Sequence, residues 1–477
     1  MDGLLTFHWW YLLVLLALVT ILRAILLEDR KQVFDDNFGR AELRRWNKGL
    51  YLGNGRITRR RSFQHCAVIA GSGMGKTVSI ILPTLLSLRD RNTSIICLDV
   101  SRELHAKSAG FQSRFGKVLV LDLTDHRNSI GYNPLVLACS PTELGLLAEI
   151  LLAPQTKNTK DSFWSIMAKK VLVFLFKLIV KLPTQFQNLA NARHLSIVLL
   201  GNPEAIDRLV VRLTRDDEQL WEEYKGLIGL DSRLLTNIVA SAQAALEIFS
   251  DPEIARVTAS HTFSCNMLRK ERISLYLWAD VTSISYYRPI FEMLFSQFFS
   301  VMMKRLPTRA DNDVFLIADE LGSFAIPGFM EASSNIRKFN VSLCWTAQSR
   351  SQISTQYSQE GEKTIMSNMF HQMYFGGMEP QVADMLSKRL GRWSFEKEGG
   401  GIGSREVATS SELQHLLEGQ ALLISGATPP AKIRLVPYYQ DWTLSRRSTI
   451  ATPPVEGQVK GEVELLDIDA FLESEGV

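Results

Sequence analysis

Cysteine is scarce in this sequence, and the few cysteines present follow no metal-binding or disulfide pattern. Of the 477 residues only five are cysteines, and no two of them form a Cys-x-x-Cys pair. The spacing therefore gives no sign of a zinc site or of a disulfide framework. Three of the cysteines lie in apolar, strand-like runs, where buried thiols are common. We expect the folded part of the protein to work in the reducing cytoplasm.

A net charge of one sign is also missing. The chain has 53 basic and 50 acidic residues, a formal net charge of +3. Composition alone therefore gives no sign of nucleic-acid binding. No internal repeat is visible. A chain of this length is too long for a single hydrophobic core, so we expect two or three domains.

Only one apolar run is long enough to cross a membrane. Residues Trp9–Leu27 are apolar apart from Thr20 and Arg23, and about 20 residues suffice to span a bilayer. Aromatic residues at its start fit an interfacial belt, and basic residues cluster after it. The positive-inside rule then places the N-terminus outside and the rest of the chain in the cytoplasm. A signal peptide is the alternative, but no basic segment precedes the run and no A-x-A cleavage site follows it.

We therefore expect a transmembrane anchor over residues 1–27 and a juxtamembrane linker over residues 28–63. The linker is polar and ends in Arg59-Arg-Arg61, which suits contact with anionic lipid headgroups. Direct contact with DNA is the alternative for this basic segment. A second apolar run, Val171–Leu182, is shorter and contains two lysines, so we interpret it as a buried helix.

The remainder of the chain is organised around one glycine-rich loop. Its residues are Gly71, Ser72, Gly73, Met74, Gly75, Lys76 and Thr77. A strand-like run, Cys66–Ala70, precedes it and a helical run, Ile80–Leu88, follows, which is the order of a phosphate-binding loop. Glycines let successive backbone N–H groups converge on phosphate oxygens. Lys76 would then reach the β- and γ-phosphates of ATP, and Thr77 would offer its hydroxyl to Mg²⁺. A glycine-rich turn with a chance Lys-Thr pair is the alternative.

A second apolar strand, Val314–Ala318, ends in two adjacent carboxylates, Asp319 and Glu320. Together with a phosphate-binding loop, such a pair predicts ATP hydrolysis. Asp319 would help to hold Mg²⁺, and Glu320 would polarise the attacking water as a general base. We expect this strand to lie directly beside the loop strand. The two motifs are about 240 residues apart, which indicates that a separate unit is inserted between early and late strands of one motor domain.

Two further residues are candidates for the same site. Gln348 follows a strand-like run, Val341–Trp345, and could report hydrolysis from a strand end near the γ-phosphate. A plain polar strand terminus is its alternative. Arg337 could act as an arginine finger on the nucleotide of a neighbouring subunit. A solvated arginine at a helix end explains it equally well.

The pattern of apolar and charged residues divides the part of the chain after the linker into four segments. Residues 64–134 and 263–447 carry continuous apolar runs, which are typical of strands covered on both faces of a parallel sheet. Residues 135–262 carry apolar residues at helical spacing and no convincing strand, so we expect an all-α inserted domain. The glycine-rich stretch 395–412 indicates a mobile loop. Residues 448–477 form an acidic tail, expected either to be solvated or to dock on a basic partner.

These motifs, in this order, carry a family resemblance. The chain resembles the type IV coupling proteins of bacterial conjugation and type IV secretion, the TraG/TraD type. The matching elements are Leu52-Gly53, the loop Gly71–Thr77, Ile96-Cys-Leu-Asp99, Glu103-Leu104, Tyr132-Asn-Pro-Leu135, Ser162-Phe-Trp164, Ala168, Ser274-Leu-Tyr276, Asp319-Glu320, Ile326-Pro327, Arg337-Lys338 and Ala347-Gln-Ser-Arg-Ser-Gln-Ile353. Phosphate loops and Asp-Glu pairs occur in many ATPases, whereas the Asn-Pro-Leu, Phe-Trp and Gln-Ser-x-Ser-Gln elements in this order are more specific.

The resemblance implies an α/β fold, a RecA-like P-loop motor domain with an all-α domain at one end of a homo-hexameric ring. It implies that ATP hydrolysis with Mg²⁺ drives delivery of a relaxase with single-stranded DNA, or of effector proteins, into a secretion channel at the bacterial inner membrane. The sequence departs from the family twice. Many members have two membrane helices, and members often carry Lys-Gly where this chain has Val100-Ser101 after Asp99.

The function predicted from the sequence is therefore that of an inner-membrane ATPase that recruits DNA–relaxase or protein substrates to a type IV secretion channel. Two alternatives differ in class. One is a DNA-pumping motor of the chromosome-segregation type, which should carry long linkers and a winged-helix end. The other is a substrate-receptor scaffold with weak ATPase activity, which the intact Lys76, Thr77, Asp319 and Glu320 argue against.

Overall fold

The core of the motor part is one nine-stranded sheet. The computed structural model describes Leu18 and residues 43–138, 140–156, 162–278, 282–323, 325–396 and 402–474. The strands are β1 (Cys66–Ile69), β2 (Thr93–Asp99), β3 (Lys117–Asp122), β4 (Ile273–Trp278), β5 (Asp313–Ala318), β6 (Val341–Ala347), β7 (His371–Phe375), β10 (Gln420–Ser425) and β11 (Ala431–Arg434). Their order is β11-β10-β7-β1-β6-β5-β2-β4-β3. All are parallel except β10 and β11, which form an antiparallel edge.

The strands are continuous apolar runs in the sequence because the side chains on both faces of the sheet are buried. Successive side chains of a strand point to opposite faces, and here both faces are covered. Val68 packs with helices on one face, α3 (Leu82–Leu85) and α4 (Glu103–Gln112). Its neighbour Ala67 belongs to the other face. That face is covered by α14 (Ile284–Met303), α15 (Phe329–Asn335), α16 (Arg350–Asn368) and α17 (Pro380–Leu390). The α/β fold predicted from the runs is confirmed.

The position of β5 corrects one expectation. We expected the strand that ends at Asp319 to lie beside the loop strand β1, but β6 lies between them. β6 pairs with β1 along Cys66–Ile69 and with β5 along Val314–Ala318. All seven residues of β6 are buried, as expected for a strand in the middle of a covered sheet. The end of β6, next to Gln348, therefore lies between the loop and the two carboxylates.

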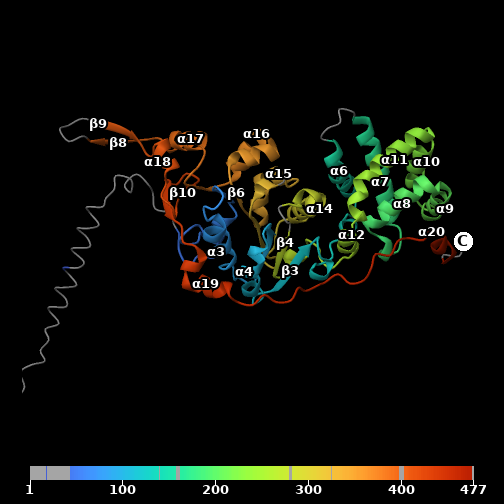
Figure 1. Cartoon of the computed structure of the whole chain (residues 1–477), viewed down its shortest axis with the longest axis horizontal. Coiled ribbons are helices and arrows are strands. Elements are labelled where there is room, and N and C mark those ends of the chain that lie inside the picture. The colour runs from blue at the N-terminus through green and yellow to red at the C-terminus, as the bar shows by residue number, and fades with distance from the viewer. Residues whose placement is uncertain are drawn as a thin grey trace, which may run out of the picture.

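A block of helices follows β3 and ends before β4. Its members are α5 (Pro134–Leu137), α6 (Pro141–Thr156), α7 (Ser162–Ile179), α8 (Leu189–Gly201), α9 (Pro203–Leu213), α10 (Glu218–Ile228), α11 (Ser232–Leu246) and α12 (Pro252–Ala259). Asn and Asp residues at the breaks cap the helices that follow; Asn188, Asn202 and Asp231 each accept a backbone N–H of the next helix. The block lies at one end of the molecule, beyond β3 and β4 (Figure 1).

The segment 395–412 differs from its prediction as a mobile loop. Most of it is ordered: β8 (Arg392–Glu396) and β9 (Ile402–Glu406) pair as an antiparallel hairpin, and α18 (Ser410–Gln414) follows. A capping box between Thr409 and Glu412 starts that short helix. The hairpin projects from the end of the molecule opposite the helical block (Figure 1).

The acidic tail also departs from the prediction of a solvated end. After α19 (Trp442–Ser448) the chain runs along the sheet to the helical block, where α20 (Ile468–Ser474) packs on α9 (Figure 1). Leu466, Ile468 and Leu472 are buried there.

The anchor expected over residues 1–27 lies outside the described residues, apart from Leu18. In the part of the chain that the structure describes, no helix is both long enough and apolar enough to cross a membrane.

Candidate nucleotide site

The glycine-rich loop joins the end of β1 to a helix and has the backbone conformation its sequence predicts. Gly73 and Gly75 have φ angles of 76° and 81°, the left-handed region that side-chain-bearing residues avoid. The backbone N–H of Ala70 donates to the carbonyl of Ala347 (3.0 Å), which ties the start of the loop to the end of β6. The helix begins at Thr77 with a π-turn, Thr77–Ile81, that continues into α3.

Lys76 and Thr77 both contact the carboxylates that follow β5. The Lys76 ammonium forms an ion pair with Glu320, with 2.6 Å between Nζ and Oε2. The Thr77 hydroxyl donates to Oδ2 of Asp319 (2.9 Å), and the Thr346 hydroxyl from the end of β6 donates to Oδ1 (3.0 Å). Residues from three different strand ends therefore meet in one polar cluster.

Glu320 is held in an unusual conformation. Its φ of 76° is a left-handed value, which is costly for a residue other than glycine and is often found at functional sites. Its backbone N–H donates to the Thr346 hydroxyl (3.3 Å). Oε1 of the same carboxylate is buried without a hydrogen-bond partner among the described residues. One carboxylate oxygen is thus left for a ligand or a water.

The charge at this edge favours a bound cation. Burial raises the pKa of Asp319, against hydrogen bonds from Thr77 and Thr346 that lower it. On the neighbouring strand β2, burial raises the pKa of Asp99 to about 6, and the charge of Asp319 adds to that rise. Two buried carboxylates so close together are relieved by a positive charge. Carboxylate and hydroxyl oxygens are the ligands Mg²⁺ prefers, so Asp319 and Thr77 fit the predicted metal role.

Gln348 lies where the prediction requires it. It follows β6 directly, and it lines a cavity of about 270 Å³ together with Ala70 and Gly71 of the loop and Glu379. Its side chain is exposed, and its backbone N–H is held by the side chain of Gln352 (3.0 Å). The structure therefore brings Gln348 to the loop.

Arg337 lies elsewhere. It is exposed on a short helical turn, Ile336–Phe339, just before β6 begins. That is the amino edge of the sheet, opposite to the loop. The pKa of His65, which precedes β1 at the same edge, is lowered to about 3, mainly by burial and then by the charge of Arg337. Arg337 cannot serve the loop of its own chain from there.

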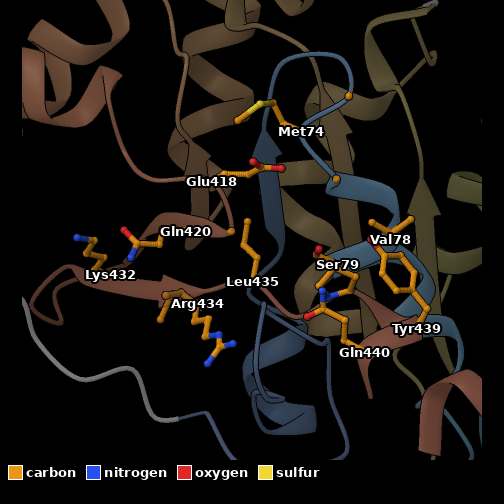
Figure 2. A pocket seen from close by; sticks show the side chains of 15 residues that line it. Met74, Val78, Ser79, Glu418, Gln420, Lys432, Arg434, Leu435, Tyr439 and Gln440 are labelled. Atoms are coloured by element: carbon orange, nitrogen blue, oxygen red, sulfur yellow. The ribbon is translucent and has the colours of Figure 1, made fainter. Parts of the chain in front are cut away.

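A larger cavity opens on the other side of the loop and was missed by sequence reasoning. It has a volume of about 710 Å³ and lies between the loop and the β10–β11 edge (Figure 2). Met74 and Val78 line it from the loop side, Gln420 and Arg434 line it from the edge strands, and Tyr439 lines it from the short helical turn Tyr438–Gln440 after β11. Tyr438-Tyr439-Gln440, an aromatic and amide cluster after Pro437, was the available signal. Only the pairing of β7 with β10 and of β10 with β11 places it beside the loop.

Comparison with known proteins decides the family. Residues 20–459 match the family model described as "Type IV secretory system Conjugative DNA transfer". The chain belongs to this conjugative DNA transfer family. The resemblance inferred from the motifs is thereby confirmed.

Curated members of the conjugative DNA transfer family are similar over most of this chain. The Protein VirD4 of Agrobacterium fabrum is 24% identical over 443 residues, which cover 86% of this chain and 63% of that protein. The VirD4 protein of Rhizobium radiobacter is 23% identical over 429 residues, covering 83% of this chain and 59% of the relative. This chain thus spans about three fifths of the length of the curated relatives it matches.

The fold is similar to that of a solved bacterial conjugative coupling protein. The bacterial conjugative coupling protein TrwBdeltaN70 superposes with a TM-score of 0.63 at 16% identity, covering 83% of this chain and 90% of that one. TrwB in complex with the ATP analogue ADPNP also gives a TM-score of 0.63, covering 84% and 96%. The mixed α/β motor fold expected for the family is therefore present.

Proposed function

We propose that this chain is an ATPase that acts as the coupling protein of a type IV secretion system. The contact that carries the proposal is the closed cluster of Lys76, Thr77, Asp319 and Glu320, whose side chains come from two motifs far apart in the sequence. Membership of a conjugative DNA transfer family supports the cellular role.

The geometry suggests how the chain's residues would act on ATP. Thr77 and Asp319 would hold Mg²⁺, which would neutralise charge on the phosphate oxygens. Lys76 is bound to Glu320, so a phosphate that draws Lys76 away would release the Glu320 carboxylate. Glu320, fixed at its backbone by Thr346, can then accept a proton from water. Gln348 would sense the γ-phosphate from the small cavity beside the loop.

The nucleoside would lie in the larger cavity. Its volume of about 710 Å³ adjoins Gly73 and Gly75 on the side away from Asp319, where the base of a bound nucleotide would extend. Tyr439 offers an aromatic face, and Gln420 and Gln440 offer amide groups to the base edge (Figure 2). These contacts would select the nucleotide, while the loop reads only phosphates.

The proposed setting follows the family. The chain would be anchored by residues 9–27 in the bacterial inner membrane, with its N-terminus in the periplasm, and would work as a homo-hexamer. Arg337, on the edge away from its own loop, would reach the nucleotide of a neighbour. Its substrates would be a relaxase with single-stranded DNA, effector proteins, or both, passed to the secretion channel.

Two measurements test the proposal. ATP hydrolysis by the full chain is measured with and without single-stranded DNA, and transfer of a mobilisable plasmid is measured in cells together with crosslinking of the transferred strand to this protein. We expect hydrolysis, its stimulation by DNA, and crosslinks during transfer. Hydrolysis and crosslinks both absent would contradict the proposal. DNA translocation without any secretion phenotype would favour the chromosome-segregation type of motor.

A further inference from the structure

The C-terminal strap, residues 457–474, is bound to the rest of the chain at two places. The first is the junction between the sheet and the helical block. There Gln458 pairs with Ile130 in an antiparallel bridge, and the backbone N–H of Val459 donates to the carbonyl of Ser129 (3.0 Å). The hydroxyl of Thr262, on the return from the helical block, donates to the carbonyl of Gly457 (3.2 Å). The strap therefore crosses both connections of the block.

The second place is the surface of α8 and α9, where α20 packs on α9 (Figure 1). The side-chain amide of Asn191 captures the strap backbone twice: Nδ2 donates to the carbonyl of Glu464 (3.0 Å), and Oδ1 accepts the N–H of Leu466 (2.9 Å). The His194 ring bonds the Leu466 carbonyl (3.1 Å). Asn191 is 0% exposed, so its amide is committed to a peptide backbone rather than to solvent.

Side chains add a pattern to this backbone recognition. Leu466, Ile468 and Leu472 are buried against the helical block, and the acidic residues between and around them face outward. Arg208 pairs with Asp469 (2.6 Å), and Arg256 lies 3.6 Å from Glu462. The segment that binds this surface thus combines buried apolar residues with exposed acidic ones that lie close to arginines.

The strap has the character of a ligand rather than of a core element. It adds no strand to the main sheet, and its last helix, Ile468–Ser474, is only seven residues long. The connection before it, residues 451–457, is largely exposed. Only a few apolar side chains and hydrogen bonds compensate for the conformational entropy that the segment loses when it is ordered. The strap can therefore detach locally while the rest of the chain stays folded.

We propose that α8 and α9 form a peptide-binding surface for acidic–apolar segments, and that residues 462–474 occupy it as the chain's own exchangeable ligand. The surface accepts a segment of the same chemistry from another protein chain when the strap is released. The proposal rests on contacts in the helical block and is independent of the nucleotide site.

The direct test uses a labelled peptide of residues 461–477 as the probe. The binding partners are the full chain and a chain ended after Lys460, which keeps the contacts at Ser129 and Thr262. We expect the shortened chain to bind the probe at least about 10-fold more tightly than the full chain, because tethering gives the strap an effective concentration of about millimolar. A probe carrying Leu466→Ser and Leu472→Ser keeps the charge and should lose the binding. Equal binding of the probe by both chains, or of both probes by the shortened chain, would overturn the proposal.

A second measurement does not depend on the shortened chain folding. Amide hydrogen exchange is followed in the full chain with Asn191→Leu, with Ser196→Ala as the matched control. Ser196 is a buried polar residue of the same helix whose hydroxyl bonds the carbonyl of Arg193 within that helix. We expect Asn191→Leu to speed exchange at residues 464–474 by at least about 10-fold, and Ser196→Ala to leave it unchanged. Unchanged exchange in Asn191→Leu would contradict the assigned binding surface.

Discussion

The parallel strands of the nine-stranded sheet start at one side, the amino edge, and end at the opposite side, the carboxyl edge. These two edges bury different ionisable groups, and the groups have different bonding partners. At the amino edge two buried histidines each make at least one hydrogen bond within the chain, and Nε2 of His65 has no partner among the described residues. His65 accepts the N–H of Leu343 (3.2 Å), and His371 bonds the Arg61 carbonyl (3.2 Å) and the Ser425 hydroxyl (2.9 Å). At the carboxyl edge the buried groups are carboxylates, Asp99 and Asp319, and they repel each other.

Strand β5 shows the same contrast within six residues. Asp313 at its start pairs with Arg59, which also bonds Asp90 (3.0 Å), so this charge is balanced by structure alone. Asp319 after its end accepts hydrogen bonds from two hydroxyls and forms no ion pair among the described residues, where Oε1 of Glu320 is also buried without a hydrogen-bond partner. The difference teaches that the charge of Asp313 is already paired within the chain, whereas the carboxylates of the carboxyl edge would gain a partner from the Mg²⁺ and nucleotide proposed to bind there.

The largest effect is expected from Lys76→Ala. Removing the ammonium should lower the rate of ATP hydrolysis by roughly 10³-fold, since it loses charge stabilisation of the transferred phosphoryl group. The matched control is Lys117→Ala at the amino edge, where the lysine pairs with Glu271 (2.7 Å). Steady-state phosphate release measures both. A Lys76→Ala variant with normal turnover would sink the assignment of the loop.

The next effect compares the two ends of β5. Asp319→Asn should weaken Mg²⁺-dependent nucleotide binding about 10- to 100-fold and leave unfolding stability equal or higher, because a buried charge is removed. Asp313→Asn should have the opposite effect. Nucleotide binding should be normal, and the free energy of unfolding should fall by about 1 kcal/mol. The loss is small because Arg59 keeps its second partner, Asp90. Nucleotide titrations and urea unfolding separate them. If both variants lost only stability, the two ends of the strand would not differ in role.

A smaller effect on hydrolysis is expected from Arg337→Ala. Because Arg337 lies away from its own loop, its loss should leave nucleotide binding by the dilute chain unchanged. In the assembled protein we expect turnover to fall by at least about 10-fold. Lys338→Ala, the exposed neighbour on the same turn, is the control. Equal turnover of the two variants at high protein concentration would remove Arg337 from the catalytic role.

The smallest effect is a pH dependence of stability. Burial lowers the pKa of His65 to about 3 and that of His371 to about 4, so folding excludes protons that the unfolded chain takes up below its ordinary histidine pKa of 6.5. Stability should therefore be full above pH 6.5 and fall toward pH 4, by on the order of 1 kcal/mol per histidine at pH 5.5.

Asp99 opposes that loss. Its pKa is raised to about 6 in the folded chain, so Asp99 takes up a proton there while it is still ionised in the unfolded chain. This proton uptake stabilises the folded chain relative to the unfolded chain as the pH falls. Asp99→Asn should remove this stabilisation and steepen the loss of stability between pH 7 and 5.5. Urea unfolding at the two pH values checks both statements. A free energy of unfolding that stays constant over this range would show that the folded chain does not keep His65 and His371 neutral.

Much of the sheet and of the site could be predicted from the sequence. The strands are apolar throughout in the sequence because both of their faces are buried. The loop is rich in glycine because the backbone has positive φ angles at Gly73 and Gly75. The roles of Glu320, Gln348 and Arg337, the domain boundaries and the membrane anchor stay predictions. Strand order did not follow from sequence. The place of β6 between β1 and β5 depends on which buried strands pair, and all of them look alike to a hydrophobic pattern.

The larger cavity beside the loop and the path of the strap could not be predicted, for a related reason. Tyr439 reaches the loop through pairings of edge strands, and the strap reaches Asn191 across more than half the chain. A local pattern reports which face of an element is apolar, not what covers it. The described acidic residues of the tail face solvent, but the prediction of a solvated end overlooked the apolar residues Leu466, Ile468 and Leu472, which are buried.

The helical block joins the sheet in a way that makes it replaceable. It leaves after β3 and returns before β4, and these two strands are parallel neighbours at the far edge. In topological terms the whole block is one enlarged crossover connection, a link that elsewhere needs only a dozen residues or so. Such a graft at an edge leaves the interior hydrogen bonds of the sheet unchanged. A different block could therefore occupy this place without changing the strands that carry the loop.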